Sequence, residues 1–189
     1  MNDESSLDRR VERTQTALRS ALLELVLERG WDAVSVQAVC ARAQVGRSTF
    51  YAHYADKEEL LLSGFDGLAR ELRAHVRRAG ADRLAFVGPL VSHVSAHRRL
   101  FRALAGKRTA HKVERRMLGV ICGLLELPAT DAPAAGGLRS AAARYAAGAC
   151  VELLTYWLDA QSGLGARDVE RLLSQLTSAL MRETERAVS

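Results

Sequence analysis

The chain has 189 residues, of which 48% are hydrophobic and 26% are charged, and its net charge is +5. These values are typical of a globular protein with one or two domains, and they permit a polyanionic partner without requiring one. The most apolar segment, near residues 141–158, contains Arg144 and Glu152. It lacks the roughly 18 uninterrupted apolar residues of a membrane span, so no membrane association is expected.

The N-terminal residues and the cysteines favour a cytoplasmic protein. The chain begins MNDESSLDRR, with acidic residues before any apolar run, which is the wrong order for a signal peptide. Cys40, Cys122 and Cys150 are odd in number, widely spaced and without a CxxC pair, so we expect reduced, buried thiols.

Apolar residues recur at helical spacing along nearly the whole chain, which predicts an all-α fold. The first helix is expected over about 8–29, ending at Gly30. Two short helices should follow: SVQAVCARA, capped by Ser35, and RSTFYAHY, after a break at 44–46.

The rest of the chain predicts longer helices. Asp56 and the acidic residues 58–59 suit the start of a helix that runs to Gly80. Another helical stretch begins near 82, and Pro89 within it predicts a kink or an end. Three more helices are expected, over 111–127, 138–160 and 167–186. The segment PATDAPAAGG, residues 128–137, is the clearest linker.

The two short helices have the dimensions of a helix-turn-helix. The second one begins with three residues placed where a recognition helix meets base edges: Arg47, Ser48 and Thr49. Phe50 can turn inward as an anchor. Three further side chains can reach phosphates through a hydroxyl, an imidazole and an ammonium: Tyr51, His53 and Lys57.

The segment SVQAVCARAQVGRSTFYAHYADKEELL resembles the DNA-binding signature of the TetR (tetracycline repressor) family, and the likeness extends over residues 8–62. VELLTYWLDAQSGLGARDVERLLSQL resembles the last two helices of that family, whereas residues 80–137 match only in helical character. The resemblance implies an N-terminal three-helix DNA-binding domain, 1–56, and a larger helical domain, 57–189, for ligand binding and dimerisation. It also implies a homodimeric regulator, usually a repressor, that leaves a palindromic double-stranded DNA operator when a small-molecule effector binds.

Two residues depart from the family pattern. Gln44 stands where the family usually has glycine, so a strained left-handed turn is expected there. Gly46 stands where a hydroxyl residue is frequent; it can cap a helix, but it offers no side chain to a phosphate.

The resemblance assigns the site residues. Those expected to bind DNA are Ser35, Arg47, Ser48, Thr49, Tyr51, His53 and Lys57. Those expected to line a ligand pocket between the long helices are Phe65, Leu68, Phe86, Leu90, Met117, Ile121, Tyr145 and Cys150.

An apolar stripe on the last helix, with small residues on the helix before it, predicts a four-helix dimer interface. Its expected members are Ala143, Ala147, Val169, Leu172, Leu173, Leu176 and Leu180. Glu152, a carboxylate inside an apolar run, is expected to face solvent at the dimer edge.

Several alternatives remain open at this point. Arg47 could read guanine or pair only with phosphate, and Arg9, Arg10 and Arg13 could contact the DNA backbone or be merely solvated. His93 and His97 stand four residues apart, but no carboxylate accompanies them at HExxH spacing, so neither a metal nor another cofactor is expected.

The rival function is a helical enzyme or carrier with a coincidental motif. No nucleophile and base pair is recognisable, so an enzyme is not expected. A regulator that has lost ligand sensing and acts through protein partners is a third possibility.

Overall fold

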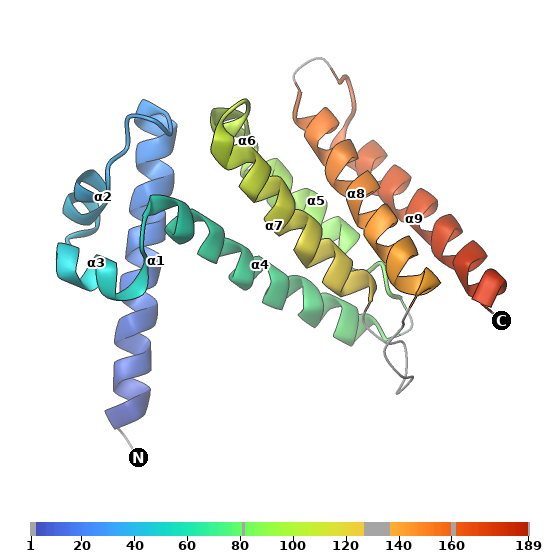
Figure 1. The fold of residues 1–189 in the computed structure, drawn as a ribbon, viewed down its shortest axis with the longest axis horizontal. Helices are drawn as coiled ribbons and strands as arrows, with labels where there is room; N and C mark the ends of the chain where they lie inside the picture. Colours follow the sequence, from blue (N-terminus) through green and yellow to red (C-terminus); the bar gives the residue numbers. More distant parts are fainter. Residues whose placement is uncertain (1–2, 81, 127–136, 160–161, 189) are drawn as a thin grey trace.

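The computed structural model describes residues 3–80, 82–126, 137–159 and 162–188, and these residues form helices without strands, which confirms the all-α fold (Figure 1). The helices in this described part are α1 (Asp3–Arg29), α2 (Val36–Ala43), α3 (Arg47–His53), α4 (Lys57–Ala79), α5 (Val87–Ala96), α6 (Arg98–Leu104), α7 (Arg108–Leu125), α8 (Leu138–Leu158) and α9 (Ala166–Val188).

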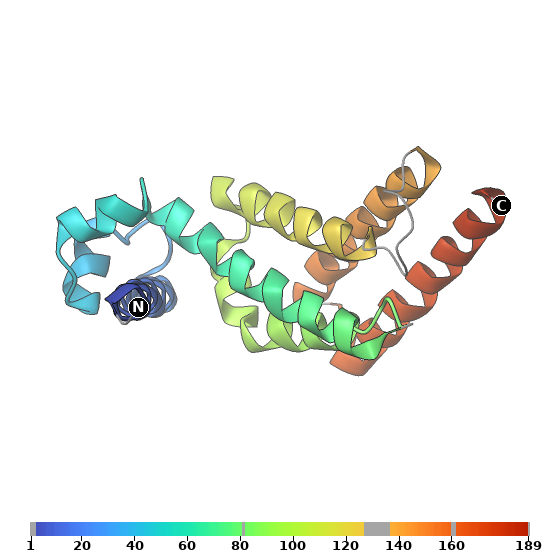
Figure 2. The same ribbon diagram turned by 90° about the horizontal axis from the view of Figure 1, so that it is seen from below.

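Helices α1, α2 and α3 gather at one end of the molecule, and α4 leads from them to the other helices (Figures 1 and 2). The apolar face of α1 packs on α2, and Leu18, Leu22 and Leu25 are at most 1% exposed. α1 begins before the predicted residue 8. Residues 3–6 carry no apolar side chain, so apolar periodicity could not detect the first turn.

Helix α4 starts and ends where the sequence predicts. The Asp56 carboxylate accepts hydrogen bonds from the backbone N–H groups of Glu58 and Glu59, both at 2.8 Å, and Gly80 follows the last turn with φ +63°. Its predicted apolar face is buried against α1 and α7: Leu61, Phe65, Leu68, Leu72 and Val76. α4 therefore contributes to both halves of the molecule.

The expected kink at Pro89 is wrong. Pro89 lies in the first turn of α5, where a backbone N–H has no acceptor within the helix, so the missing proton costs nothing. The chain breaks instead at His97, between α5 and α6. This break sets α6 against α1.

The C-terminal helices pack together as a separate group from α1 to α3. In this group α8 packs against both α7 and α9, and α9 also packs on α5. Apart from Gly137, the predicted linker lies outside the described residues. Among the helices described, none is long and apolar enough to cross a membrane.

Candidate nucleic-acid interface

The turn between α2 and α3 has the geometry of a helix-turn-helix. Ser35 caps α2, since its Oγ accepts a hydrogen bond of 3.1 Å from the N–H of Ala38. Gln44 has φ +55° and ψ +39°, which is the left-handed conformation expected from the sequence. Gly46 precedes α3 in an extended conformation and makes no side-chain cap.

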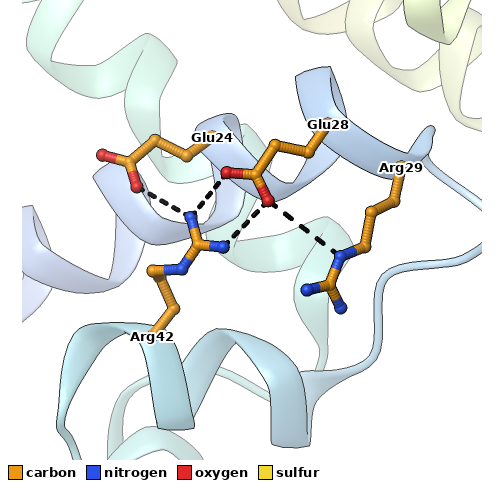
Figure 3. Close-up of polar contacts among 4 residues, drawn as sticks. All are labelled: Glu24, Glu28, Arg29 and Arg42. Carbon is orange, nitrogen blue, oxygen red and sulfur yellow. Dashed lines mark hydrogen bonds and ion pairs between the residues drawn. The ribbon is translucent and has the colours of Figure 1, made fainter.

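An ion-pair cluster that the sequence analysis did not identify fixes α2 on α1 (Figure 3). Arg42 donates two hydrogen bonds of 2.8 Å to Glu28 and one of 3.1 Å to Glu24. The hydrogen bond from Arg42 lowers the pKa of the Glu28 carboxyl. Glu24 and Glu28 are four residues apart on one face of α1, and this spacing was the available signal.

Helix α3 has a buried side and an exposed side. Phe50 is fully buried and Tyr54 is 6% exposed, with ring centroids 5.8 Å apart, which confirms the inward anchor. The opposite side carries exposed groups suited to a duplex: Arg47, Ser48, Thr49 and Tyr51. The Tyr51 side chain is 51% exposed although its ring lies edge-on to Phe50 at 5.4 Å. His53 is half-buried beside Tyr54.

Lys57 does not point outward as its expected phosphate contact requires. Its ammonium donates hydrogen bonds of 2.7 Å to the carbonyl oxygens of Trp31 and Val34, and it lies 4.6 Å from the centre of the Trp31 ring. Burial lowers the Lys57 pKa, and the charges of Asp32 and Glu58 oppose this effect. In this structure Lys57 holds the loop between α1 and α2 against the start of α4.

Further polar contacts join the helix-turn-helix unit and the start of α4 to α7. Lys107, just before α7, forms an ion pair of 2.5 Å with Asp32. Glu58 accepts hydrogen bonds from the Thr109 hydroxyl at 3.1 Å and from Lys112. The sequence offered no signal for these pairs, because their partners are more than 50 residues apart.

The expected pocket residues do not lie together. Phe65 and Leu68 line a cavity of about 330 Å³. Three of the others are fully packed core residues with at most 1% exposure: Phe86, Leu90 and Ile121. Met117 borders a void of about 40 Å³, and Cys150 lies at a groove between α8 and α9.

Tyr145 is 71% exposed, which contradicts its assignment to a pocket wall. Periodicity predicts which face of a helix is apolar, but it does not distinguish a cavity wall from close packing. That distinction depends on how the facing helices fit together.

The expected dimer residues are divided between core and surface. Four are buried within the chain itself, so they are not free to contact a partner: Ala143, Ala147, Val169 and Leu173. Leu172 and Leu180 are half-buried, whereas Leu176 is 64% exposed. Most of the apolar stripe of α9 thus packs on α5 and α8.

Leu176 lies with Tyr156 and Glu152 along a groove of about 410 Å³ between α8 and α9. Tyr156 is 55% exposed, and Glu152 is exposed as predicted. This groove is the part of the expected interface that remains open.

The helix-turn-helix unit matches known regulators in sequence. Residues 18–63 match the family model for bacterial regulatory proteins of the tetR family. The HTH-type transcriptional regulator YxbF of Bacillus subtilis (strain 168) is 34% identical over 79 residues, which cover 41% of this chain and 21% of YxbF. YdeS of the same organism is 38% identical over 56 residues, covering 30% of this chain and 28% of YdeS. The chain thus aligns with less than a third of either relative.

Solved structures resemble nearly the whole chain in fold. A putative TetR-family regulator from Syntrophomonas wolfei has a TM-score of 0.64 at 16% identity, over 90% of this chain and 95% of that one. The dihydroxyacetone kinase operon activator DhaS has a TM-score of 0.63 at 19% identity, over 91% and 96% of the two chains. FadR of Thermus thermophilus, a repressor in complex with lauroyl-CoA, has a TM-score of 0.59 at 18% identity, over 88% and 94%.

The family match coincides with the helix-turn-helix geometry, and the fold likeness extends through α9. Residues 18–63 thus match the tetR family of bacterial regulatory proteins, and the chain has the fold of solved TetR-family regulators.

Proposed function

We propose that the protein is a ligand-responsive repressor that binds a palindromic operator as a homodimer. The observation that carries this proposal is the division of α3, with Phe50 and Tyr54 buried and Arg47 to Thr49 exposed at the helix N-terminus. Such an arrangement presents side chains to a major groove and anchors the helix from behind. Residues 1–56 would form the DNA-binding domain and residues 57–189 the ligand-binding and dimerisation domain.

Two kinds of contact with DNA are proposed. Arg47, in the first turn of α3, reads a base edge, and Ser48 and Thr49 contribute hydrogen bonds beside it. Ser35, Tyr51 and His53 contact the phosphate backbone, which sets the register of the helix in the groove without reading sequence. Lys57 is proposed to contribute by holding the loop of Trp31 and Val34 in place.

The proposed dimer uses the open groove between α8 and α9. Leu176 and Tyr156 are large apolar side chains, 64% and 55% exposed, on adjacent helices. A twofold axis through this groove would pair each side chain with its counterpart in a second copy, and it would place two α3 helices to meet two half-sites.

Repression by this protein is proposed in preference to activation. The relevant precedents differ: FadR of Thermus thermophilus is a repressor that was crystallised with lauroyl-CoA, and DhaS is an operon activator. The rival function, an enzyme or carrier, requires the helix-turn-helix motif to be coincidental. It is disfavoured because that motif lies within the family match over residues 18–63.

To test this function, the DNA fragments that the purified protein retains are recovered and sequenced. The recovered site is then used in a gel shift and in transcription in vitro. We expect a palindromic site, a complex with two protein chains, and a reduced transcript. An increased transcript would contradict repression while leaving DNA binding intact. Retention of no preferred sequence would contradict the operator itself.

A further inference from the structure

A cavity of about 330 Å³ lies where the helix-turn-helix unit meets the rest of the molecule. One wall is α1, which presents Thr16, Arg19, Ser20 and Leu23, spaced as neighbours on one helix face. The facing wall is α4 with Phe65 and Leu68, and α5 to α7 close the remaining sides. The volume is in the range of small-molecule sites. Its lining is mainly apolar on the α4 and α6 sides and polar on the α1 side.

Arg19 is the fixed charge in this cavity. Among the residues that the structure describes, none accepts a hydrogen bond from its guanidinium or pairs with it as a carboxylate. The nearby hydroxyls of Thr16 and Ser20 are likewise without a partner in the described part of the chain. A half-buried guanidinium with five N–H donors and no acceptor suits an anionic group, and a carboxylate matches its planar fork.

His93 and His97 line the same cavity. Their rings lie 4.3 Å apart, and Nδ1 of His97 donates a 2.9 Å hydrogen bond to the carbonyl oxygen of His93. Burial, with a smaller contribution from His97, lowers the pKa of His93 to about 4. His93 is therefore uncharged near neutral pH and lies beside the apolar side chains of the cavity.

Two glycines in the middle of α4 also border the cavity. Gly64 and Gly67 lie inside a helix, where glycine is less favourable than alanine. Neither is required by close packing, because a Cβ built at either position meets no atom within 4 Å. The missing side chains leave open space in the cavity instead.

We propose that this cavity binds an amphipathic carboxylate, with its hydrocarbon body between α4 and α6 and its carboxylate on Arg19. This inference rests on the proposed ligand-responsive function and specifies the chemistry and position of its effector site. The apolar body matches Phe65, Leu68 and Leu100, and the charge matches the Arg19 guanidinium, which has no acceptor among the described residues.

The position of the cavity also explains how a ligand would affect DNA binding. Arg19 is on α1, the helix to which α2 is clamped by Arg42, whereas Phe65 and Leu100 belong to α4 and α6. A molecule that contacts all three helices favours one orientation of α1 relative to α4 and α6. Because α1 carries the helix-turn-helix, that orientation sets the spacing of the two α3 helices in the dimer.

The first test measures binding to the purified full chain by calorimetry and by thermal shift, with decanoate, decanol and decyltrimethylammonium as probes. We expect decanoate to bind at least tenfold more tightly than decanol and to raise Tm, and the ammonium compound not to bind. Arg19→Gln should weaken decanoate about tenfold and leave decanol unchanged. Arg77→Gln, an exposed arginine on α4 outside the cavity, is the matched control and should change neither.

A second variant tests the location. Gly64→Leu places a side chain in the open space and should abolish decanoate binding while the protein remains folded with an equal or higher Tm. Equal affinities for decanoate and decanol, or full decanoate binding by either Arg19→Gln or Gly64→Leu, would overturn the proposal.

A gel shift on the recovered operator separates this inference from the proposed function. Decanoate that binds through Arg19 without releasing DNA would leave the cavity assignment standing and remove ligand-responsive repression. A compound could instead release DNA while it binds Arg19→Gln and Gly64→Leu with the same affinity as the unmodified protein. That result would support ligand-responsive repression and overturn the cavity assignment.

Discussion

The ammonium of Lys57 lies 4.6 Å from the centre of the Trp31 ring and donates a 2.7 Å hydrogen bond to the Trp31 carbonyl oxygen. A second bond of the same length reaches Val34. The first residue of α4 thus secures the loop that leads into α2. A lysine that the sequence assigns to a phosphate contact is, in this structure, half-buried and bonded to backbone carbonyl oxygens of the chain itself.

Lys57→Ala should therefore act mainly on stability. The loss of two charge-assisted hydrogen bonds and a cation–π contact should lower the free energy of unfolding by about 2–3 kcal/mol. Operator affinity should fall with little change in its salt dependence, because no ammonium is withdrawn from a phosphate. Denaturant unfolding and titrations at several salt concentrations measure both effects. A salt slope reduced by about one per half-site would show that Lys57 reaches a phosphate in the complex.

Arg47→Ala should affect sequence preference. If the guanidinium makes a bidentate contact with a guanine edge, its removal should cost about 1–3 kcal/mol and relax the preference at one base pair in each half-site. Tyr51→Phe is the control, since losing a phosphate-directed hydroxyl should weaken all sequences slightly and equally. Binding of both variants to operator and scrambled DNA measures the difference. A uniform loss for Arg47→Ala would indicate a phosphate contact instead.

Gln44→Gly should stabilise the protein. The left-handed conformation at φ +55° costs a residue with a Cβ about 1–2 kcal/mol, and glycine removes this cost. Part of the resulting gain in stability is offset by the greater freedom of glycine in the unfolded chain. We expect a net gain of about 0.5–1 kcal/mol in denaturant unfolding. Gln44→Ala, which keeps the Cβ, should have almost no effect; equal stabilisation by both variants would exclude backbone strain as the cause.

The dimer proposal predicts different outcomes for two neighbouring leucines on α9. Leu176→Glu combined with Tyr156→Ser should give folded monomers that bind DNA poorly, because both side chains are exposed in the single chain. Leu173→Glu should instead unfold the protein, since Leu173 is 3% exposed and a buried unpaired carboxylate is costly. Analytical ultracentrifugation and circular dichroism distinguish these results. A dimeric double variant would place the interface elsewhere.

His93 should make the protein less stable in mild acid. Burial, with a smaller contribution from His97, lowers its pKa from an ordinary value of 6.5 to about 4 in the folded chain, and Glu71 opposes this lowering. Between these values the unfolded chain binds a proton that the folded chain does not, so stability falls as the pH drops from 6.5 towards 4. With allowance for partial exposure to solvent, the loss should be about 1–2 kcal/mol.

The variant His93→Gln should remove this loss, which denaturant unfolding at a series of pH values measures. His111→Gln, at an exposed histidine on α7, should retain it. An unchanged pH profile in His93→Gln would assign the acid sensitivity to other groups.

Local interactions explain why the helix-turn-helix was predictable. The caps at Ser35 and Asp56 and the left-handed turn at Gln44 each depend on residues within a few positions of one another. The contacts of Lys57 and Arg42 were not predictable in this way, because their partners lie 14 to 26 residues away and become neighbours only after folding.

The sequence by itself determined that the chain is helical, where most of the helices begin and end, and that Phe50 anchors a recognition helix. Apolar periodicity and capping carry this information, since both act within one or two helical turns. Only the tertiary structure decided that Leu173 is core whereas Leu176 is surface, and that Phe65 lines a cavity whereas Phe86 is packed solid. An apolar helix face has the same sequence pattern when the facing helix packs closely, when it leaves a void and when it belongs to a second chain. Only the packing of helices from distant parts of the chain distinguishes these cases.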